Sequence, residues 1–295
     1  MYFVLFLLGV ALGSFLNVLI TRYNPDQKFS LSAITGRSYC DSCKKQLRWY
    51  ELVPLISFII QKRACRSCGT RLSWQYPFVE FMMGILAVLI GRLFLYGYVF
   101  SAAVTTGELY ISIIFWLVVS LVLLFALMID AKHYIIPNGT NILLFILGVI
   151  WTVWVVWLGF GREISQGSFL GHFAPLFGSF GGVVLNHIIG MLLAVVLFIL
   201  IVLVSRGRGM GIGDVKLVSA LGLLFGWPDI GVIVFASFII GTILIIPLLI
   251  TRQKRGSDQI PFGPFMVVAS LVVLVWGTSL LQAYFDIIGK LGGGI

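Results

Sequence analysis

Seven apolar stretches, each about 20 residues long, constrain the fold of this chain more than any other feature. They cover residues 1–20, 77–98, 108–130, 139–160, 185–205, 229–251 and 263–285, and a shorter stretch covers 214–227. A helix needs about 20 apolar residues to cross a hydrocarbon core of ~30 Å. With 60% hydrophobic and 11% charged residues, the chain is predicted to be an all-α polytopic membrane protein with about eight transmembrane helices.

The positions of the cations predict the orientation of these helices, because Lys and Arg of short loops stay on the cytoplasmic side. Ten of the 20 Lys and Arg residues lie in segment 21–76, which we therefore place in the cytoplasm. Alternating the eight spans from there puts seventeen cations inside and only Arg92, Arg162 and Lys290 near the outer side. Stretch 1–20 lacks a basic flank and a cleavage site, so we expect it to stay as the first helix with its N-terminus outside.

The net charge of +9 does not by itself indicate a nucleic-acid partner. Clustered cations are the usual footprint of such a partner, but here the membrane topology already explains where they lie. We therefore expect membrane lipid rather than nucleic acid around this chain. The sequence does not indicate an oligomeric state.

All four cysteines lie in segment 21–76, as the pairs Cys40/Cys43 and Cys65/Cys68. Two residues between paired thiolates let a tight turn aim both sulfurs at one metal, and Gly69 suits a positive φ after the second pair. Disulfides are the alternative, but they are rare in the cytoplasm. The pattern predicts a small cytoplasmic loop domain that binds a structural Zn²⁺ through four thiolates.

Two aspartates border the predicted spans and suggest a functional site, because acidic groups are costly in a membrane. Asp130 ends the stretch 108–130, and Pro137 is suited to open the next helix. Asp214 opens the short stretch after Gly209, Gly211 and Gly213. A stretch of about 14 residues is too short to cross a bilayer straight, so we expect a recessed or broken helix there.

Asp130 and Asp214 both fall at the predicted cytoplasmic face, where they can act as a pair. Two neighbouring carboxylates cannot both ionise easily, so one acts as an acid while the other acts as a base. This chemistry predicts hydrolysis of a peptide bond by an activated water. The alternatives are a solvated interfacial Asp130, and glycines 211 and 213 that serve tight helix packing.

Other chemistries fit the sequence less well. The three histidines, His133, His172 and His187, form no His-Glu-x-x-His motif, and no Gly-x-Ser-x-Gly elbow is present. A transporter also uses intramembrane acids and broken helices, but the sequence lacks the repeated halves of such proteins. An aspartyl protease remains the favoured interpretation.

Several ordered motifs resemble those of the bacterial type IV prepilin peptidases, the A24-type leader peptidases. They are the segments Gly13–Arg22, Leu47–Pro54 and Ser73–Glu80, the two cysteine pairs, Ile129–Asp130 with Ile136–Asn138, Gly211–Lys216, and Pro261–Pro264. The resemblance covers most of the chain. One departure is Lys132, where many members of the family have a second aspartate.

The resemblance implies a function in the bacterial cytoplasmic (inner) membrane. Members cut the basic leader of type IV prepilins or pseudopilins after a glycine at the cytoplasmic face, and Asp130 and Asp214 match their catalytic aspartates. Many members then methylate the new N-terminus with S-adenosylmethionine, whose binding residues the sequence does not identify; a peptidase without this activity is the alternative. Glu80 and Lys216 match family positions and are possible accessory residues; the alternative, which we favour, is that they pair with each other or with lipid headgroups.

These implications divide the chain into three parts. Residues 1–20 form the first transmembrane helix, residues 21–76 form the zinc-binding domain linked to methylation, and residues 77–295 form the transmembrane aspartyl protease domain.

Overall fold

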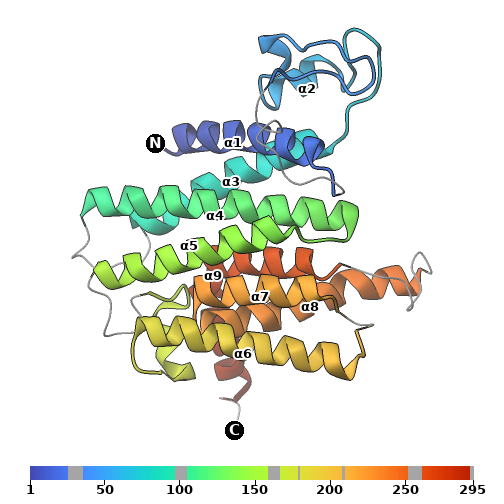
Figure 1. The fold of residues 1–295 in the computed structure, drawn as a ribbon. Coiled ribbons are helices and arrows are strands. Elements are labelled where there is room, and N and C mark those ends of the chain that lie inside the picture. Colours follow the sequence, from blue (N-terminus) through green and yellow to red (C-terminus); the bar gives the residue numbers. More distant parts are fainter. Residues whose placement is uncertain are drawn as a thin grey trace. The chain divides into compact units, whose positions relative to one another are not determined.

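The computed structural model of the chain is helical (Figure 1). It describes residues 1–25, 36–96, 105–158, 167–178, 180–207, 210–251 and 261–292. Within these ranges the only strand-like pairings are two isolated bridges, Tyr39 with Gln46 and Ala64 with Arg71. Gly209 of the predicted glycine motif lies outside the described residues.

Seven helices of the described chain are long and apolar enough to cross a membrane. They are α1 (Tyr2–Arg22), α3 (Gln75–Tyr96), α4 (Thr106–His133), α5 (Asn138–Trp157), α6 (Val183–Val204), α8 (Asp229–Ile250) and α9 (Gly263–Gly292). The eighth predicted segment is α7 (Ile212–Phe225), whose 14 residues span only about 21 Å. The predicted all-helical membrane fold is confirmed. The shorter elements are η2 (Trp49–Glu51), α2 (Ile56–Ile60) and η4 (Gly171–Phe177).

The helices form two compact units, the first of which contains Met1–Leu95 and Tyr110–Phe125. In this unit α1 and α3 approach closely through small residues: a Cβ on Gly13 would lie 2.7 Å from the Cα of Glu80. The buried Asn17 side chain also donates a hydrogen bond of 3.0 Å to the Tyr76 carbonyl. Both contacts fix the start of α3, and with it the loop domain that precedes α3, against α1.

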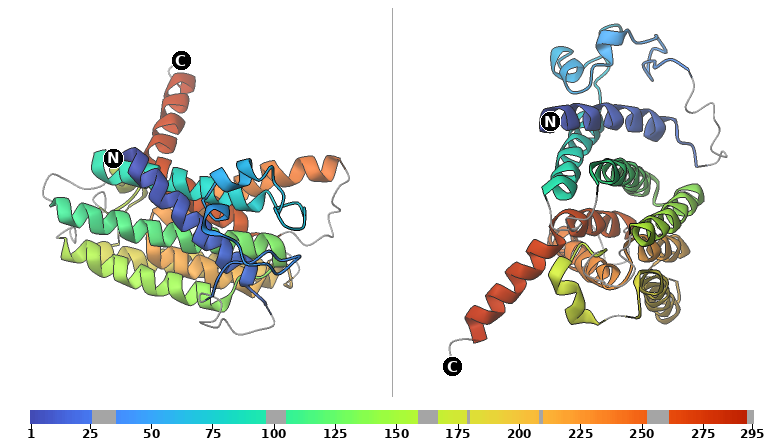
Figure 2. Two further views of the ribbon diagram at one scale, coloured as in Figure 1. Left: turned by 90° about the horizontal axis from the view of Figure 1, so that it is seen from above. Right: turned by 90° about the vertical axis from the view of Figure 1, so that its left-hand side faces the viewer.

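The second unit contains Tyr96–Leu109 and Ala126–Ile295, and α7 lies at its centre among α5, α6, α8 and α9 (Figure 1). Glycines allow this close approach. A Cβ on Gly222 would lie 2.6 Å from the Cα of Met191 on α6, and one on Gly148 of α5 would lie 3.0 Å from the Leu224 nitrogen. Backbones that meet without side chains between them pack tightly in membranes. Figure 2 shows that the C-terminal part of α9 extends away from these helices.

The far end of α7 is fixed by buried polar groups that the sequence did not single out. Nδ1 of His187 hydrogen-bonds the Leu223 carbonyl at 2.6 Å, and the Trp227 N–H donates to the Asn186 carbonyl at 3.0 Å. The fully buried Asp229 accepts the N–H of Phe169 at 2.8 Å. Because α7 begins where α6 ends and finishes beside the start of α6, the two helices run antiparallel.

Replacing Gly222 with alanine should destabilise the second unit. The new methyl group meets backbone atoms of Met191 that cannot rotate away, and overpacking of this kind costs about 1–3 kcal/mol. The measurement is unfolding of the purified chain in mixed micelles. The matched control is Gly289→Ala, because a Cβ at Gly289 meets nothing within 4 Å; equal stability of the two variants would contradict the packing described here.

Candidate functional site

Asp130 lies in the last turn of α4, at a helix end that the backbone defines clearly. Tyr134 adopts a left-handed conformation with φ 58°, and its N–H donates to the Asp130 carbonyl at 2.8 Å. Pro137 then serves as the N-cap residue of α5, which agrees with its predicted place at the start of the helix. The Asp130 side chain is 4% exposed, and its Oδ2 has no hydrogen-bond partner in the described part of the chain.

Asp214 lies in the first turn of α7 and caps it. The N–H of the N-cap residue Gly211 donates to Oδ2 of Asp214 at 3.1 Å, and the Asp214 N–H donates to the Gly211 carbonyl at 3.1 Å. Free N–H groups and the helix dipole favour a negative charge at this position. The side chain is only 9% exposed, so the carboxylate is held inside the protein by its own helix end.

The second unit brings Asp130 and Asp214 together with the first residue of α9. The two carboxyl groups are near enough for an unfavourable electrostatic interaction. The backbone N–H of Gly263 interacts with both of them. A Cβ on Gly263 would overlap Oδ2 of Asp130, so the site requires glycine at this position. Three helix ends from distant parts of the sequence therefore converge on one carboxyl pair.

The pair lies a short way inside the end of the helix bundle. Gly222 of α7 packs against Met191 of α6. Because the two helices are antiparallel, Asp214, eight residues before Gly222, lies at the level of Ile199, eight residues after Met191. Ile199 precedes the end of α6 at Val204 by five residues, or about 7.5 Å. This depth agrees with the prediction of a short, recessed helix.

The glycines before Asp214 do not serve tight packing. A Cβ on Gly211 would have Oδ2 of Asp214 as its nearest contact at 3.8 Å, and one on Gly213 would meet only Ile136 at 3.9 Å. Both are ordinary contact distances, and the close helix approach occurs at Gly222 and Gly148 instead. The packing alternative therefore does not explain Gly211 and Gly213.

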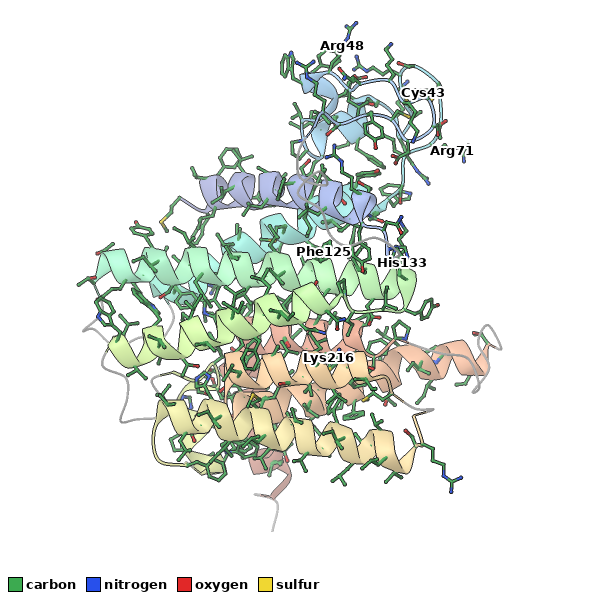
Figure 3. The ribbon with its side chains drawn as sticks, viewed as in Figure 1. Cys43, Arg48, Arg71, Phe125, His133 and Lys216 are labelled. Carbon is green, nitrogen blue, oxygen red and sulfur yellow. The ribbon has the colours of Figure 1, made fainter. Side chains whose placement is uncertain are left out.

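The two possible accessory residues have different surroundings. Lys216 is exposed, lies on α7 (Figure 3), and donates to Oδ1 of Asn138 at 2.8 Å, which ties α7 to the start of α5. Glu80 is buried in the first unit, where Oε2 accepts the N–H of Leu55 at 2.8 Å and the carboxylate also bonds Ser14. Glu80 thus connects α1, α3 and the loop domain.

The four cysteines of the loop domain form one cluster. Their Sγ atoms all lie within 4.8 Å of one another, and none forms a disulfide. Tetrahedral coordination with Zn–S bonds of about 2.3 Å separates the sulfurs by about 3.8 Å. The Sγ atoms of Cys40 and Cys68 are 3.8 Å apart, so the cluster fits a tetrahedral thiolate site.

Two turns of the same design present these sulfurs. In the first, the Lys44 N–H donates to the Cys40 carbonyl at 2.9 Å, and in the second the Gly69 N–H donates to the Cys65 carbonyl at 2.9 Å. Lys44 and Gly69 both have positive φ, 57° and 69°, which confirms the backbone expected at Gly69. The Sγ of Cys68 is also hydrogen-bonded to the Thr70 hydroxyl oxygen at 3.3 Å, which fixes this sulfur within the second turn.

The fold and these two sites define a multi-pass membrane protein with an acid pair where helix ends converge and with four clustered cysteines in a loop that could hold a metal ion. Residues 7–94 match the Bacterial Peptidase A24 N-terminal domain, and residues 117–246 match the Type IV leader peptidase family. The chain belongs to the type IV leader peptidase family.

Relatives with matching length bear the same descriptive name, Prepilin leader peptidase/N-methyltransferase. The protein from Aeromonas salmonicida is 28% identical, over 98% of this chain and 95% of its own. That from Pseudomonas aeruginosa is 27% identical over 96% and 93%, and that from Bacillus subtilis is 28% identical over 95% and 96%. No solved structure matches the chain.

Sequence reasoning missed two of the groups that build these sites. Gly263 lies in the quoted motif Pro261–Pro264, but its role depends on a contact with Asp130, which is 133 positions away in the sequence. The hydrogen bond from the Leu55 N–H to the Glu80 carboxylate was also not predicted. The sequence carries no signal that pairs the backbone of a loop with a carboxylate on a helix. The motif itself was the available signal for Gly263.

Removing two thiolates should abolish metal binding by the loop domain. Purified wild-type chain is expected to contain about one Zn²⁺, whereas the variant Cys40→Ser with Cys43→Ser should contain none and become sensitive to protease within residues 36–76. Metal analysis and limited proteolysis measure both effects. Ser42→Ala, which lies between the same two cysteines, serves as the control; wild-type protein without zinc would refute the assignment.

Proposed function

We propose that this chain removes the leader of type IV prepilins or pseudopilins and then methylates the new N-terminus. The observation that supports this proposal most strongly is the buried pair of Asp130 and Asp214 at the convergence of α4, α7 and α9. The family and the names of the relatives agree with both activities. Prepilins are therefore the proposed protein substrates.

The proposed hydrolysis uses the two carboxyl groups in opposite protonation states. Asp214 accepts the Gly211 N–H at a helix N-terminus, an environment that favours its carboxylate, so we assign it as the base. Oδ2 of Asp130 is buried and has no hydrogen-bond partner among the described residues, which suits a protonated acid that can donate to a substrate.

The proposed cleavage passes through a tetrahedral intermediate and returns both aspartates to their starting protonation states. Asp214 takes a proton from a water while the water oxygen bonds to the scissile carbonyl carbon, and Asp130 gives its proton to the carbonyl oxygen. The tetrahedral intermediate collapses as the C–N bond breaks, the amine receives the proton held by Asp214, and Asp130 recovers its proton from the hydroxyl group. Gly211 and Gly213 leave the approach to Asp214 free of side chains, which suits a peptide backbone.

We further propose the orientation and division of labour. Segment 21–76 faces the cytoplasm, residues 1–20 form the first span, and residues 77–295 carry the protease chemistry. The loop domain, stabilised by Zn²⁺, supports methylation. When bound, S-adenosylmethionine supplies the methyl group for the new amine. Lys216 and Glu80 act by positioning: Lys216 holds the start of α7 against Asn138, and Glu80 holds the loop domain at Leu55.

Removing either carboxylate should abolish cleavage without unfolding the chain. Asp130→Asn and Asp214→Asn are each expected to lower the single-turnover rate on a purified prepilin by about 10³-fold, while the exposed Asp286→Asn should cleave normally. Mass spectrometry of the product N-terminus measures cleavage and methylation together. Normal cleavage by either variant would eliminate the acid-pair mechanism.

Methylation is tested separately with a mature pilin that already has a free N-terminus. Both aspartate variants should transfer a labelled methyl group to it at the wild-type rate, because this step needs no hydrolysis. A wild-type chain that cleaves but transfers no label is a peptidase only.

Gly263→Ala should slow cleavage by about 100-fold, because the new methyl group pushes the Asp130 carboxyl out of place. Gly139→Ala is the matched control, since a Cβ there meets nothing within 4 Å. The rate of single-turnover cleavage and the unfolding midpoint are measured for both. If Gly263→Ala cleaves as fast as the control, the converging site described here is wrong.

A further inference from the structure

The short helix α2 presents an apolar face that the loop domain does not use. Ile56, Ile59 and Ile60 follow the spacing i, i+3, i+4, which places them on one side of the helix. Their side chains are 55%, 74% and 61% exposed. A water-facing surface of a small polar domain does not favour three adjacent isoleucines.

The opposite side of α2 is the side that packs on the protein. Phe58 is 8% exposed and lies against Trp74, with ring centroids 5.2 Å apart. Trp74 directly precedes α3, and its own ring is 62% exposed. The contact of α2 with the rest of the domain therefore leaves the isoleucine face exposed.

The position of α2 along the axis of α1 explains why the exposed face of α2 is apolar. Leu55, the N-cap residue of α2, is bonded to Glu80, which also bonds Ser14 of α1. Ser14 precedes the end of α1 at Arg22 by eight residues, or about 12 Å. Figures 1 and 2 show the loop domain lying over the C-terminal half of α1 rather than beyond its end. The start of α2 is therefore attached to the membrane-spanning part of α1 and not beyond the end of that helix.

The helix that follows the loop domain also exposes apolar side chains. Phe78 and Phe81 in the first turns of α3 are 52% and 46% exposed. They follow Trp74, on which Phe58 of α2 packs. Trp74 thus connects α2 to a membrane-spanning helix whose first turns expose apolar side chains.

Cations surround this surface in the pattern of a membrane interface. Lys62 and Arg63 come after Gln61, the C-cap residue of α2, and the Arg63 guanidinium lies 5.3 Å from the centre of the Trp74 ring. Residues 36–76 contain eight Lys and Arg but only Asp41 and Glu51 as acids. Tryptophan and basic residues beside an apolar helix face are typical of segments that lie in the headgroup region.

We propose that α2 is an interfacial membrane helix that anchors the loop domain in the leaflet at the C-terminal end of α1. Ile56, Ile59 and Ile60 contact acyl chains, and Lys62 and Arg63 bind the headgroups of anionic phospholipids. The positive charge favours anionic lipid over a basic peptide as the occupant of this surface. The zinc site is thereby held beside the membrane, independently of whether the chain cleaves prepilins.

Photo-crosslinking of the full chain in nanodiscs tests this placement. Benzoylphenylalanine at position 59 should form adducts with phospholipid, whereas the same group at position 46, where Gln46 is exposed, should not. In discs with equal phosphatidylglycerol and phosphatidylcholine, we expect about fivefold more adduct with the anionic lipid, the ratio that corresponds to a preference of about 1 kcal/mol. Lys62→Gln should reduce this preference and Lys45→Gln should not.

Adducts at position 59 with another part of this chain or with added prepilin, or equal lipid adducts at both positions, would overturn the proposal. A measurement on the unmodified chain guards against misfolded variants. In nanodiscs, hydroxyl radicals should oxidise Ile56, Ile59 and Ile60 at least tenfold more slowly than isoleucines that are exposed to water to the same extent. Oxidation at the rate of water-exposed isoleucine would also reject a membrane position for α2.

Discussion

The close approach of α7 to its neighbours is the packing constraint on which the candidate active site depends. Without side chains at Gly222 and Gly148, the α7 backbone lies directly against α6 and α5, and this contact fixes how far α7 extends along the bundle. Its 14 residues then end inside the bundle rather than at the surface. Asp214 is therefore buried beside Asp130, although both belong to helix ends.

The burial of a like-charged pair has a cost that the fold offsets locally. Two helices, α7 and α9, direct their N-terminal backbone groups at the carboxyl groups, so backbone N–H groups and helix dipoles stabilise a negative charge there. One carboxyl oxygen of Asp130 has no such partner. The asymmetry gives the two aspartates different environments, which is what an acid and a base at one site require.

Much of this architecture follows from local sequence signals. Apolar length predicted each long helix and the short α7, and the cysteine spacing predicted the thiolate cluster, because both properties depend on neighbouring residues. The role of Gly263 and the contact between Glu80 and Leu55 did not follow, because each is a tertiary contact between segments that carry no pairing signal. Gly211 and Gly213 illustrate the opposite case: the sequence marked them as unusual, but a Cβ at either position would make only ordinary contacts, so close packing does not explain them.

The most direct test of the account is a structure of the Asp214→Asn chain in nanodiscs with an uncleaved prepilin bound. The scissile carbonyl should lie between residues 130 and 214, within hydrogen-bond reach of both side chains, at about 2.6–3.2 Å. A prepilin whose scissile bond lies away from this pair would contradict the assignment of Asp130 and Asp214 as the catalytic residues.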